Sequence, residues 1–136
     1  MAEGAILGVD PGTSKCGLAV VDSSGEVSYR AVVALENLSA TARALAAQRA
    51  LGRLALGNRT GAQRVRALLE EALPEIPVEV VPEHRTTEEA RRLYWEYHPP
   101  RGWRRLVPRG MLVPPEPVDG FAAEILARRL EESAGS

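Results

Sequence analysis

The sequence contains very little lysine, cysteine or aromatic side chain. Lys15 is the only lysine, Cys16 is the only cysteine, and Phe, Trp and Tyr together make up 4% of the 136 residues. A single cysteine excludes an internal disulfide and is typical of a reducing compartment, so we expect a cytoplasmic protein. No apolar run is long enough to span a bilayer, and no segment resembles a signal peptide.

Positive charge is carried almost entirely by arginine, yet the formal net charge of the chain is −1. The chain as a whole is therefore not a polycation. Arginine suits bidentate phosphate contacts, but a genome biased toward Arg, Ala and Pro codons gives the same composition, so composition alone does not indicate nucleic-acid binding. With 45% apolar and 26% charged residues, the chain is expected to fold as one domain, residues 1–136.

The first third of the chain has the pattern of an antiparallel meander. Residues 5–10 form an apolar run that ends at Asp10, and a Pro-Gly turn follows it. Residues 16–22 and 26–34 are the next two predicted strands, and a Ser-Ser-Gly turn separates them.

Helices and strands alternate in the rest of the chain. The apolar spacing predicts helices from Ser39 as N-cap to about Gly52, from Thr60 or Gly61 to Pro74 and Pro77, from Thr86 or Thr87 to about Tyr97, and from about Val118 to Glu132. Strands are predicted at Leu54–Leu56 and Val78–Val81, the second of them buried. Residues 98–117 hold six prolines and two glycines and are expected to be a loop, and residues 133–136 a disordered tail.

The resulting order, βββαβαβαα, indicates an α/β fold. A meander followed by alternating helices and strands implies a mixed five-stranded sheet with helices on both faces.

Three acids occupy positions that such a fold can bring together at one sheet edge. Asp10 ends the first strand, Glu83 follows the last strand, and Asp119 begins the last helix. Clustered carboxylates repel one another, and a divalent cation removes that penalty. Mg²⁺ or Mn²⁺ binds through a few carboxylates plus water and phosphate. The acids therefore predict a site for one or two such ions, of the kind that cleaves phosphodiesters.

Each of the three acids also has an ordinary structural interpretation. Asp10 can be a turn former before Pro-Gly, Glu83 can be a surface acid, and Asp119 can be a helix N-cap. The metal-site prediction therefore depends on the acids together with the motifs around them.

Four motifs occur in order between about Ala5 and Leu130: GVDPGTSKCGLAVVD, LALGNRTG, PEHRTTEEA and VDGFAAEIL. In order and spacing they resemble the YqgF/RuvX family, RuvC-like nucleases of the RNase H superfamily. The resemblance implies an RNase H-like fold and divalent-metal nuclease chemistry. It also implies a role in processing the 5′ end of 16S ribosomal RNA precursors; the family's older label is Holliday junction resolvase.

The resemblance assigns the three acids to the catalytic site. Asp10 matches the family's first-strand aspartate, Glu83 the glutamate of its Asp-Glu-Arg-x-Thr-Thr motif, and Asp119 the aspartate before an Ala-Ala pair. The middle motif departs from the family, because Pro82 replaces the aspartate and Arg85 is shifted by one position.

A fourth acid is a candidate additional metal ligand. RuvC carries two acids three residues apart at its last helix, and Glu116 and Asp119 have the same spacing. The alternative is that Glu116 is a solvated loop residue between two prolines.

Residues 84–109 combine positive charge with aromatic rings. Seven arginines stand against three glutamates there, and both tryptophans lie in the segment. Arginine takes phosphates and rings stack on bases, so this composition suits single-stranded nucleic acid. At least one of Tyr94 and Trp95 is expected to pack the helix instead. The predicted substrate contacts are Arg85, Trp103, Arg104, Arg105 and Lys15, the last with a solvated turn lysine as its alternative.

Two other classes of protein fit part of the sequence. Actin-like kinases and ATPases open with a phosphate loop similar to residues 10–14, but they need two such domains and this chain has room for one. A non-catalytic nucleic-acid-binding module is favoured by the altered PEHR motif and disfavoured by the presence of all three acids.

The sequence thus predicts a Mg²⁺- or Mn²⁺-dependent endonuclease. The predicted substrate is structured or single-stranded RNA, in precursor 16S processing. The alternative is resolution of branched DNA at a Holliday junction, which needs two sites acting on opposed strands and hence a homodimer.

Overall fold

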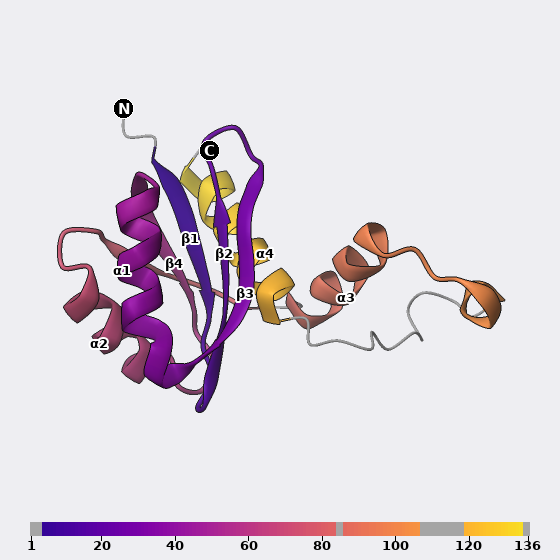
Figure 1. Ribbon diagram of the computed structural model, residues 1–136, viewed down its shortest axis with the longest axis horizontal. Helices are drawn as coiled ribbons and strands as arrows, with labels where there is room; N and C mark the ends of the chain where they lie inside the picture. Colours follow the sequence, from indigo (N-terminus) through magenta and orange to yellow (C-terminus); the bar gives the residue numbers. More distant parts are fainter. Residues whose placement is uncertain (1–3, 84–85, 107–118, 135–136) are drawn as a thin grey trace.

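A single mixed sheet forms the centre of the computed structural model, which describes residues 4–83, 86–106 and 119–134. Its strands are β1 (Ala5–Asp10), β2 (Lys15–Val21), β3 (Val27–Ala34), β4 (Leu51–Gly57) and β5 (Val78–Val81), in the spatial order β3-β2-β1-β4-β5 (Figure 1). The first three strands are antiparallel neighbours, and β4 and β5 run parallel to β1. The predicted meander and mixed five-stranded sheet are confirmed.

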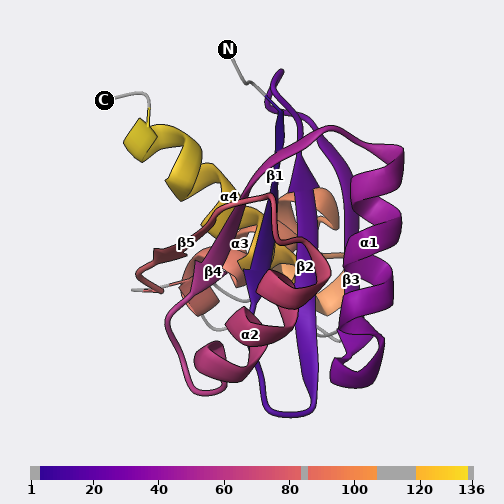
Figure 2. The ribbon, with the colours of Figure 1, turned by 90° about the vertical axis from the view of Figure 1, so that its left-hand side faces the viewer.

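Helices cover both faces of this sheet, as predicted. They are α1 (Leu38–Gln48), α2 (Ala62–Ala72), α3 (Thr86–Tyr97) and α4 (Asp119–Ala134), with short 3₁₀ helices η1 (Leu35–Asn37) and η2 (Gly102–Leu106). One face carries α1 and α2, and the other carries α4 (Figures 1 and 2). Within the described ranges, no helix is long and apolar enough to cross a membrane.

Strand alternation divides the core into two layers. Along β1, Leu7 and Val9 point toward α1 and α2, whereas Ile6 packs with residues of α4. Gly8 faces α4 at close range, because a Cβ atom built on it would collide with the carbonyl oxygen of Ala123. The missing side chain at Gly8 therefore lets α4 lie directly on the central strand.

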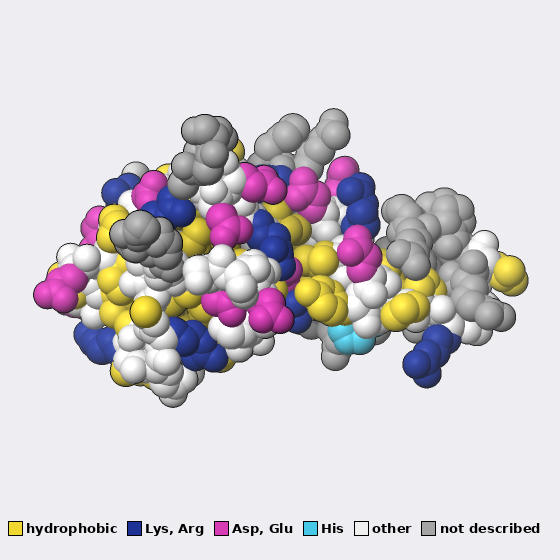
Figure 3. Space-filling model, turned by 90° about the horizontal axis from the view of Figure 1, so that it is seen from above, with side chains coloured by type: hydrophobic (Ala, Val, Ile, Leu, Met, Phe, Trp, Pro, Cys, Tyr) yellow, Lys and Arg dark blue, Asp and Glu magenta, His cyan; other side chains and the backbone are white. Residues whose placement is uncertain are grey.

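Helix α3 packs against α4 rather than on the sheet. Tyr94 and Trp95 are buried in a cluster with Phe121 and other residues of α4. This confirms the expectation that at least one of the two rings packs the helix, although the helix packs on α4 and not, as the prediction had it, on the sheet. Beyond α3, η2 lies at the far end of an extension from the main body (Figure 1), where single hydrophobic side chains are exposed (Figure 3).

The boundaries of α1 and β4 and the burial of β5 differ most from the prediction. Ser39 is not the N-cap of α1, because η1 leads directly from β3 into a helix that begins at Leu38. The helix ends at Gln48, and β4 begins at Leu51, because pairing with β1 extends the short predicted strand. The strand at 78–81 lies at the sheet edge, so Val80 is 49% exposed rather than buried.

The C-terminal third also differs in part. Residues 102–106 form η2 inside the segment predicted to be a loop, and 107–118 lie outside the described residues. Helix α4 extends to Ala134, so the first two residues of the predicted disordered tail are helical, and 135–136 also lie outside the description.

Candidate active site

Asp10 lies at the end of β1 on the face that α4 covers. Side chains alternate along a strand, and Ile6 and Gly8 face α4, so Asp10 belongs to the same face. It is partly buried, and the chain turns at Pro11 directly after it. The fold therefore holds a carboxylate at the end of a central strand, on the sheet edge where the strands finish, as the sequence predicts.

Glu83 follows the outermost strand, β5, which β4 separates from β1, and it reaches the same end of the sheet as Asp10. Its side chain is 2% exposed, and it folds back over Gly57, the last residue of β4. A Cβ atom built on Gly57 would lie 2.7 Å from Glu83 Cγ and would collide with the carboxyl carbon. The glycine at the end of β4 thus leaves the space in which the Glu83 carboxylate sits.

Three contacts join Glu83 to the loop after β4, two of them through its carboxylate and one through its backbone N–H. The backbone N–H of Arg59 donates to Glu83 Oε2 at 2.7 Å, and Arg59 Nε lies 3.4 Å from Oε1. In return, the backbone N–H of Glu83 donates to Asn58 Oδ1 at 3.2 Å. Burial of a carboxylate demands polar partners, and here the two oxygens differ: Oε2 accepts the backbone hydrogen bond, whereas Oε1 has the ion-pair contact with the Arg59 guanidinium.

The strand register brings Asp10 and Glu83 close together. Val9 pairs with Leu56 in parallel strands, so the next residues, Asp10 and Gly57, end adjacent strands at the same edge. Adjacent strands lie about 4.8 Å apart, and the Glu83 carboxylate lies over Gly57. Two of the three predicted catalytic acids therefore lie on the same face of the same edge.

The third acid, Asp119, is placed by its backbone alone. It begins α4, and the following Gly120 packs so closely on β3 that a Cβ atom would lie 2.7 Å from Arg30 Cγ. Ala31, the residue after Arg30 in β3, pairs with Leu18 of β2, and Leu18 pairs with Val9 of β1. Arg30 therefore lies near the level of the last residues of β1. Helix α4 therefore starts on the face of Asp10, at about the level where β1 ends.

The donor set at this edge fits a hard divalent cation. Asp10 and Glu83 offer carboxylate oxygens, and Gly57 provides the space that one of them needs. Each carboxylate oxygen has more than one lone pair, so the contacts from Arg59 leave Glu83 further capacity as a ligand. Within the described part of the chain, no three His, Cys, Asp or Glu side chains are grouped as a metal site. The side chain of Asp119 lies outside that part.

A pocket of about 300 Å³ adjoins Asp10. Lys15 lies in it, exposed at the start of β2, as do the hydroxyl residues of the Pro-Gly turn and Arg59. Gly61, the predicted start of the following helix, is the N-cap of α2, with a φ of 92°. A side chain at Gly61 would approach the Gly12 carbonyl oxygen to 2.9 Å, so the two loops touch here. The pocket thus combines one acid with two cations.

The other predicted site residues lie elsewhere or outside the described residues. Trp103 lies on η2 and is 68% exposed. Arg104 and Arg105 belong to the same 3₁₀ helix, but their side chains are not among those described. Arg85 and Glu116 lie outside the described ranges.

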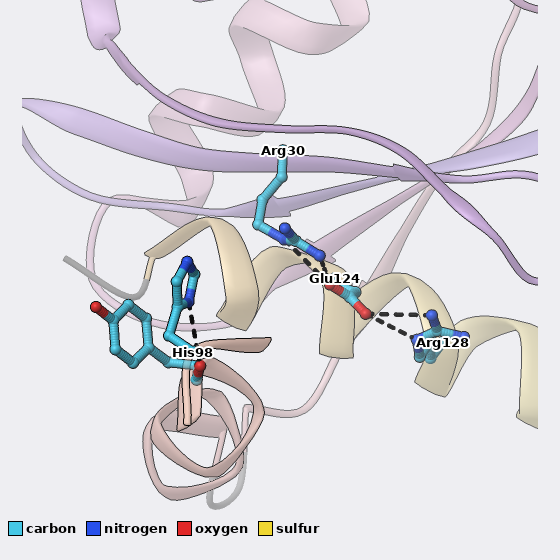
Figure 4. A network of polar contacts seen from close by, with 5 residues as sticks. Arg30, His98, Glu124 and Arg128 are labelled. Atoms are coloured by element: carbon cyan, nitrogen blue, oxygen red, sulfur yellow. Dashed lines mark hydrogen bonds and ion pairs between the residues drawn. The ribbon is translucent and has the colours of Figure 1, made fainter. Parts of the chain in front are cut away.

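The structure shows two polar groups that the sequence analysis missed. One is Arg59 beside Glu83, for which the Asn-Arg-Thr-Gly turn after a strand was a local signal. The other is Glu124, which is fully buried on α4 and accepts hydrogen bonds from Arg30 at 2.7 Å and Arg128 at 3.1 Å (Figure 4). Arg30 and Glu124 lie 94 residues apart in the sequence, so no local sequence pattern predicts the pair.

Comparison with solved structures identifies the fold. A structure of RuvC from Thermus thermophilus in complex with a Holliday junction substrate matches with a TM-score of 0.61 and 15% sequence identity, covering 97% of this chain and 96% of that chain. A second Thermus thermophilus RuvC structure matches with a TM-score of 0.59 and 16% identity, covering 96% of each chain. The chain has a RuvC-like fold, which confirms the predicted RNase H-like architecture. No protein-family model matches the sequence, and no curated protein does.

Proposed function

We propose that this protein is a divalent-metal-dependent nuclease that hydrolyses phosphodiester bonds. The observation that carries the proposal is the placement of Asp10 and the Glu83 carboxylate on one face of one sheet edge. Two acids brought together from separate strands repel each other unless a cation joins them. The similarity in fold to RuvC supports the same interpretation, a site for nuclease chemistry.

The proposed metal ligands are Asp10, Glu83 and Asp119, with Glu116 as an additional candidate. A bound Mg²⁺ or Mn²⁺ would position the scissile phosphate and lower the pKa of an attacking water. The loop after β4 holds Glu83 in place through two hydrogen bonds. Its carboxylate can therefore orient an ion without a prior change of side-chain conformation. Lys15 lies beside Asp10 in the pocket, where a cation can hold a phosphate of the substrate backbone.

The extension beyond α3 is the proposed nucleic-acid contact. Trp103 exposes most of its ring on η2, and an exposed indole offers a base a stacking surface. Arg85, Arg104 and Arg105 remain proposed substrate contacts from the sequence. A large exposed ring on a segment with little core to fill favours a binding role over packing.

Two substrates have separate support. The motif resemblance to the YqgF/RuvX family supports structured or single-stranded RNA, with precursor 16S ribosomal RNA as the natural case. The similarity to a RuvC that was solved with a Holliday junction substrate supports branched DNA. Junction resolution additionally requires a homodimer.

A cleavage assay with defined substrates tests the proposal. The purified chain is offered single-stranded RNA, single-stranded DNA, duplex and a four-way junction, with Mg²⁺, Mn²⁺ or chelator. We expect cleavage with metal, none with chelator, and none for Asp10→Asn, while Glu75→Gln, an exposed acid in the turn before β5, behaves as wild type. Cleavage that persists in chelator would refute the metal mechanism. Binding without cleavage by wild type and Asp10→Asn alike would indicate a non-catalytic module, and symmetric cleavage of the junction alone would favour DNA over RNA.

A further inference from the structure

Arg59 places a cation directly on one of the proposed metal ligands. Its backbone N–H and its guanidinium contact different oxygens of the Glu83 carboxylate, at 2.7 and 3.4 Å. The two side chains differ sharply in exposure, since that of Arg59 is 48% exposed and that of Glu83 is 2% exposed. The buried acid is therefore fixed in place, while its charged partner reaches it from the solvent side.

A buried carboxylate needs a neutralising partner, and both the Arg59 guanidinium and a divalent ion can take that role. Without a metal ion, the Arg59 guanidinium balances the charge that burial would otherwise leave uncompensated. A divalent ion bound to Glu83 would balance the same charge, and it would repel a guanidinium only a few ångströms away. The two cations therefore stabilise the same carboxylate in competition with each other.

The Arg59 guanidinium can also occupy space away from Glu83. Arg59 lines the pocket that contains Asp10 and Lys15, and it lines a second pocket with Asn58 and Thr60. Both pockets are lined by the turn after β1, and the Arg59 side chain is half exposed, so it can rotate away from Glu83 without displacing buried residues. The backbone N–H of Arg59 can keep its bond to Oε2 during this movement, because it belongs to the main chain.

We propose that Arg59 is a built-in countercation for Glu83, which a divalent ion must displace when it binds, so that metal loading frees the guanidinium toward the pocket lined by Asn58 and Thr60, which contains neither proposed metal ligand. This inference rests on the proposed metal site. It makes Arg59 a positioning residue that holds Glu83 in place before metal binds and weakens metal affinity as a consequence.

Calorimetric titration with Mn²⁺ tests this competition. We expect Arg59→Ala and Arg59→Gln to bind Mn²⁺ about threefold to tenfold more tightly than wild type, because the competing ion pair is gone. Arg64→Ala, which removes an exposed arginine from α2, should leave the affinity unchanged. In a Glu83→Gln background, Arg59→Ala should have no effect. Unchanged or weaker Mn²⁺ binding by both Arg59 variants would overturn the proposal.

Thermal unfolding and NMR supply readouts that do not depend on activity. Without metal, Arg59→Ala should melt at a lower temperature than wild type, and added Mn²⁺ should raise its melting temperature by more. In wild type, the Arg59 Nε–H signal, assigned by its loss in Arg59→Gln, should shift when diamagnetic Mg²⁺ is added. A signal that stays in place while Mg²⁺ binds would also overturn the inference.

These outcomes separate the inference from the function beneath it. If wild type binds no Mn²⁺, or binds it equally well after Asp10→Asn, then the proposed metal site fails and the competition fails with it. If Asp10→Asn abolishes binding while the Arg59 variants bind as wild type does, only the competition is refuted.

Discussion

The Glu83 carboxylate occupies the space that a side chain at position 57 would fill. Gly57 is the last residue of β4, whereas Glu83 follows β5, the outermost strand of the sheet. Because Gly57 has no side chain, the carboxylate of Glu83 can lie over the end of β4, one strand closer to the centre of the sheet. Because β4 is the direct neighbour of β1, the position of the carboxylate over Gly57 brings Glu83 toward Asp10. The site thus depends on a missing side chain as much as on the acids themselves.

Replacing Gly57 with alanine should displace Glu83. The new methyl group collides with the carboxyl carbon, and overpacking of this kind costs about 1–3 kcal/mol in the free energy of unfolding. We expect Gly57→Ala to lower the denaturation midpoint and to abolish metal-dependent cleavage, measured by urea titration and by the substrate assay.

The double variant Gly57→Ala/Glu83→Ala is the matched control for this collision. Removing the carboxylate relieves the clash, so stability should recover relative to Gly57→Ala, while cleavage should remain absent. Wild-type cleavage by Gly57→Ala would show that the position of Glu83 does not matter for the site.

The buried Glu124 is predicted to stabilise the packing of α4 on β3. It joins Arg30 and Arg128, and the Arg30 guanidinium carbon lies 4.3 Å from the centre of the Phe121 ring. Breaking a buried ion pair from one side is strongly destabilising, so Glu124→Gln should cost about 2–3 kcal/mol, the arginines being partly exposed. Chemical denaturation monitored by circular dichroism measures the change.

An exposed pair on α2 provides the matched control. Glu70 contacts Arg66 at 3.2 Å, and both side chains are about half exposed. Such a pair contributes little, so Glu70→Gln should change stability by less than about 0.5 kcal/mol. Equal effects of Glu70→Gln and Glu124→Gln would contradict the role assigned to burial.

The sequence predicts the acids of the site better than it predicts their surroundings. Asp10 follows from an apolar run that ends at a Pro-Gly turn, a purely local signal. The location of Glu83 after a strand is local too, but its fold back over Gly57 depends on the register of β4 and β5, which no local pattern encodes. The same holds for Arg30 and Glu124, whose contact spans 94 residues.

The misplaced boundaries have related physical causes. The alanine-rich stretch before residue 50 suits a helix, which the prediction extends to about Gly52, yet pairing with β1 begins the strand at Leu51 rather than at Leu54. Likewise, three valines among the four residues at 78–81 suggest burial, but the strand is the outermost one of the sheet. In both cases tertiary pairing overrides a local preference.

The turn between β2 and β3 gives a prediction for acid pH. The Ser24 hydroxyl donates to Asp22 Oδ1 at 2.6 Å and lowers the pKa of that carboxyl, with help from the backbone N–H groups of Ser24 and Glu26. A lowered pKa in the folded state stabilises the protein above the pKa of the unfolded chain, and this contribution is lost as pH falls through the folded value. Ser24→Ala should raise the Asp22 pKa, as followed by NMR titration of the carboxyl carbon. Ser23→Ala is the control, and equal pKa values in both variants would refute the assignment.

Trp103 is predicted to bind nucleic acid through its exposed ring. Its ring is 68% exposed on η2, and stacking of one base on an aromatic ring is worth about 1–3 kcal/mol. Trp103→Ala should therefore weaken binding of a single-stranded oligonucleotide roughly fivefold to a hundredfold in fluorescence anisotropy, with little change in melting temperature. Leu106→Ala is a matched control, because Leu106 is 87% exposed on the same 3₁₀ helix but has no ring to stack. If both variants lost affinity equally, η2 would act as an apolar contact surface rather than as a stacking platform. If neither lost affinity, the extension beyond α3 would not be the nucleic-acid contact.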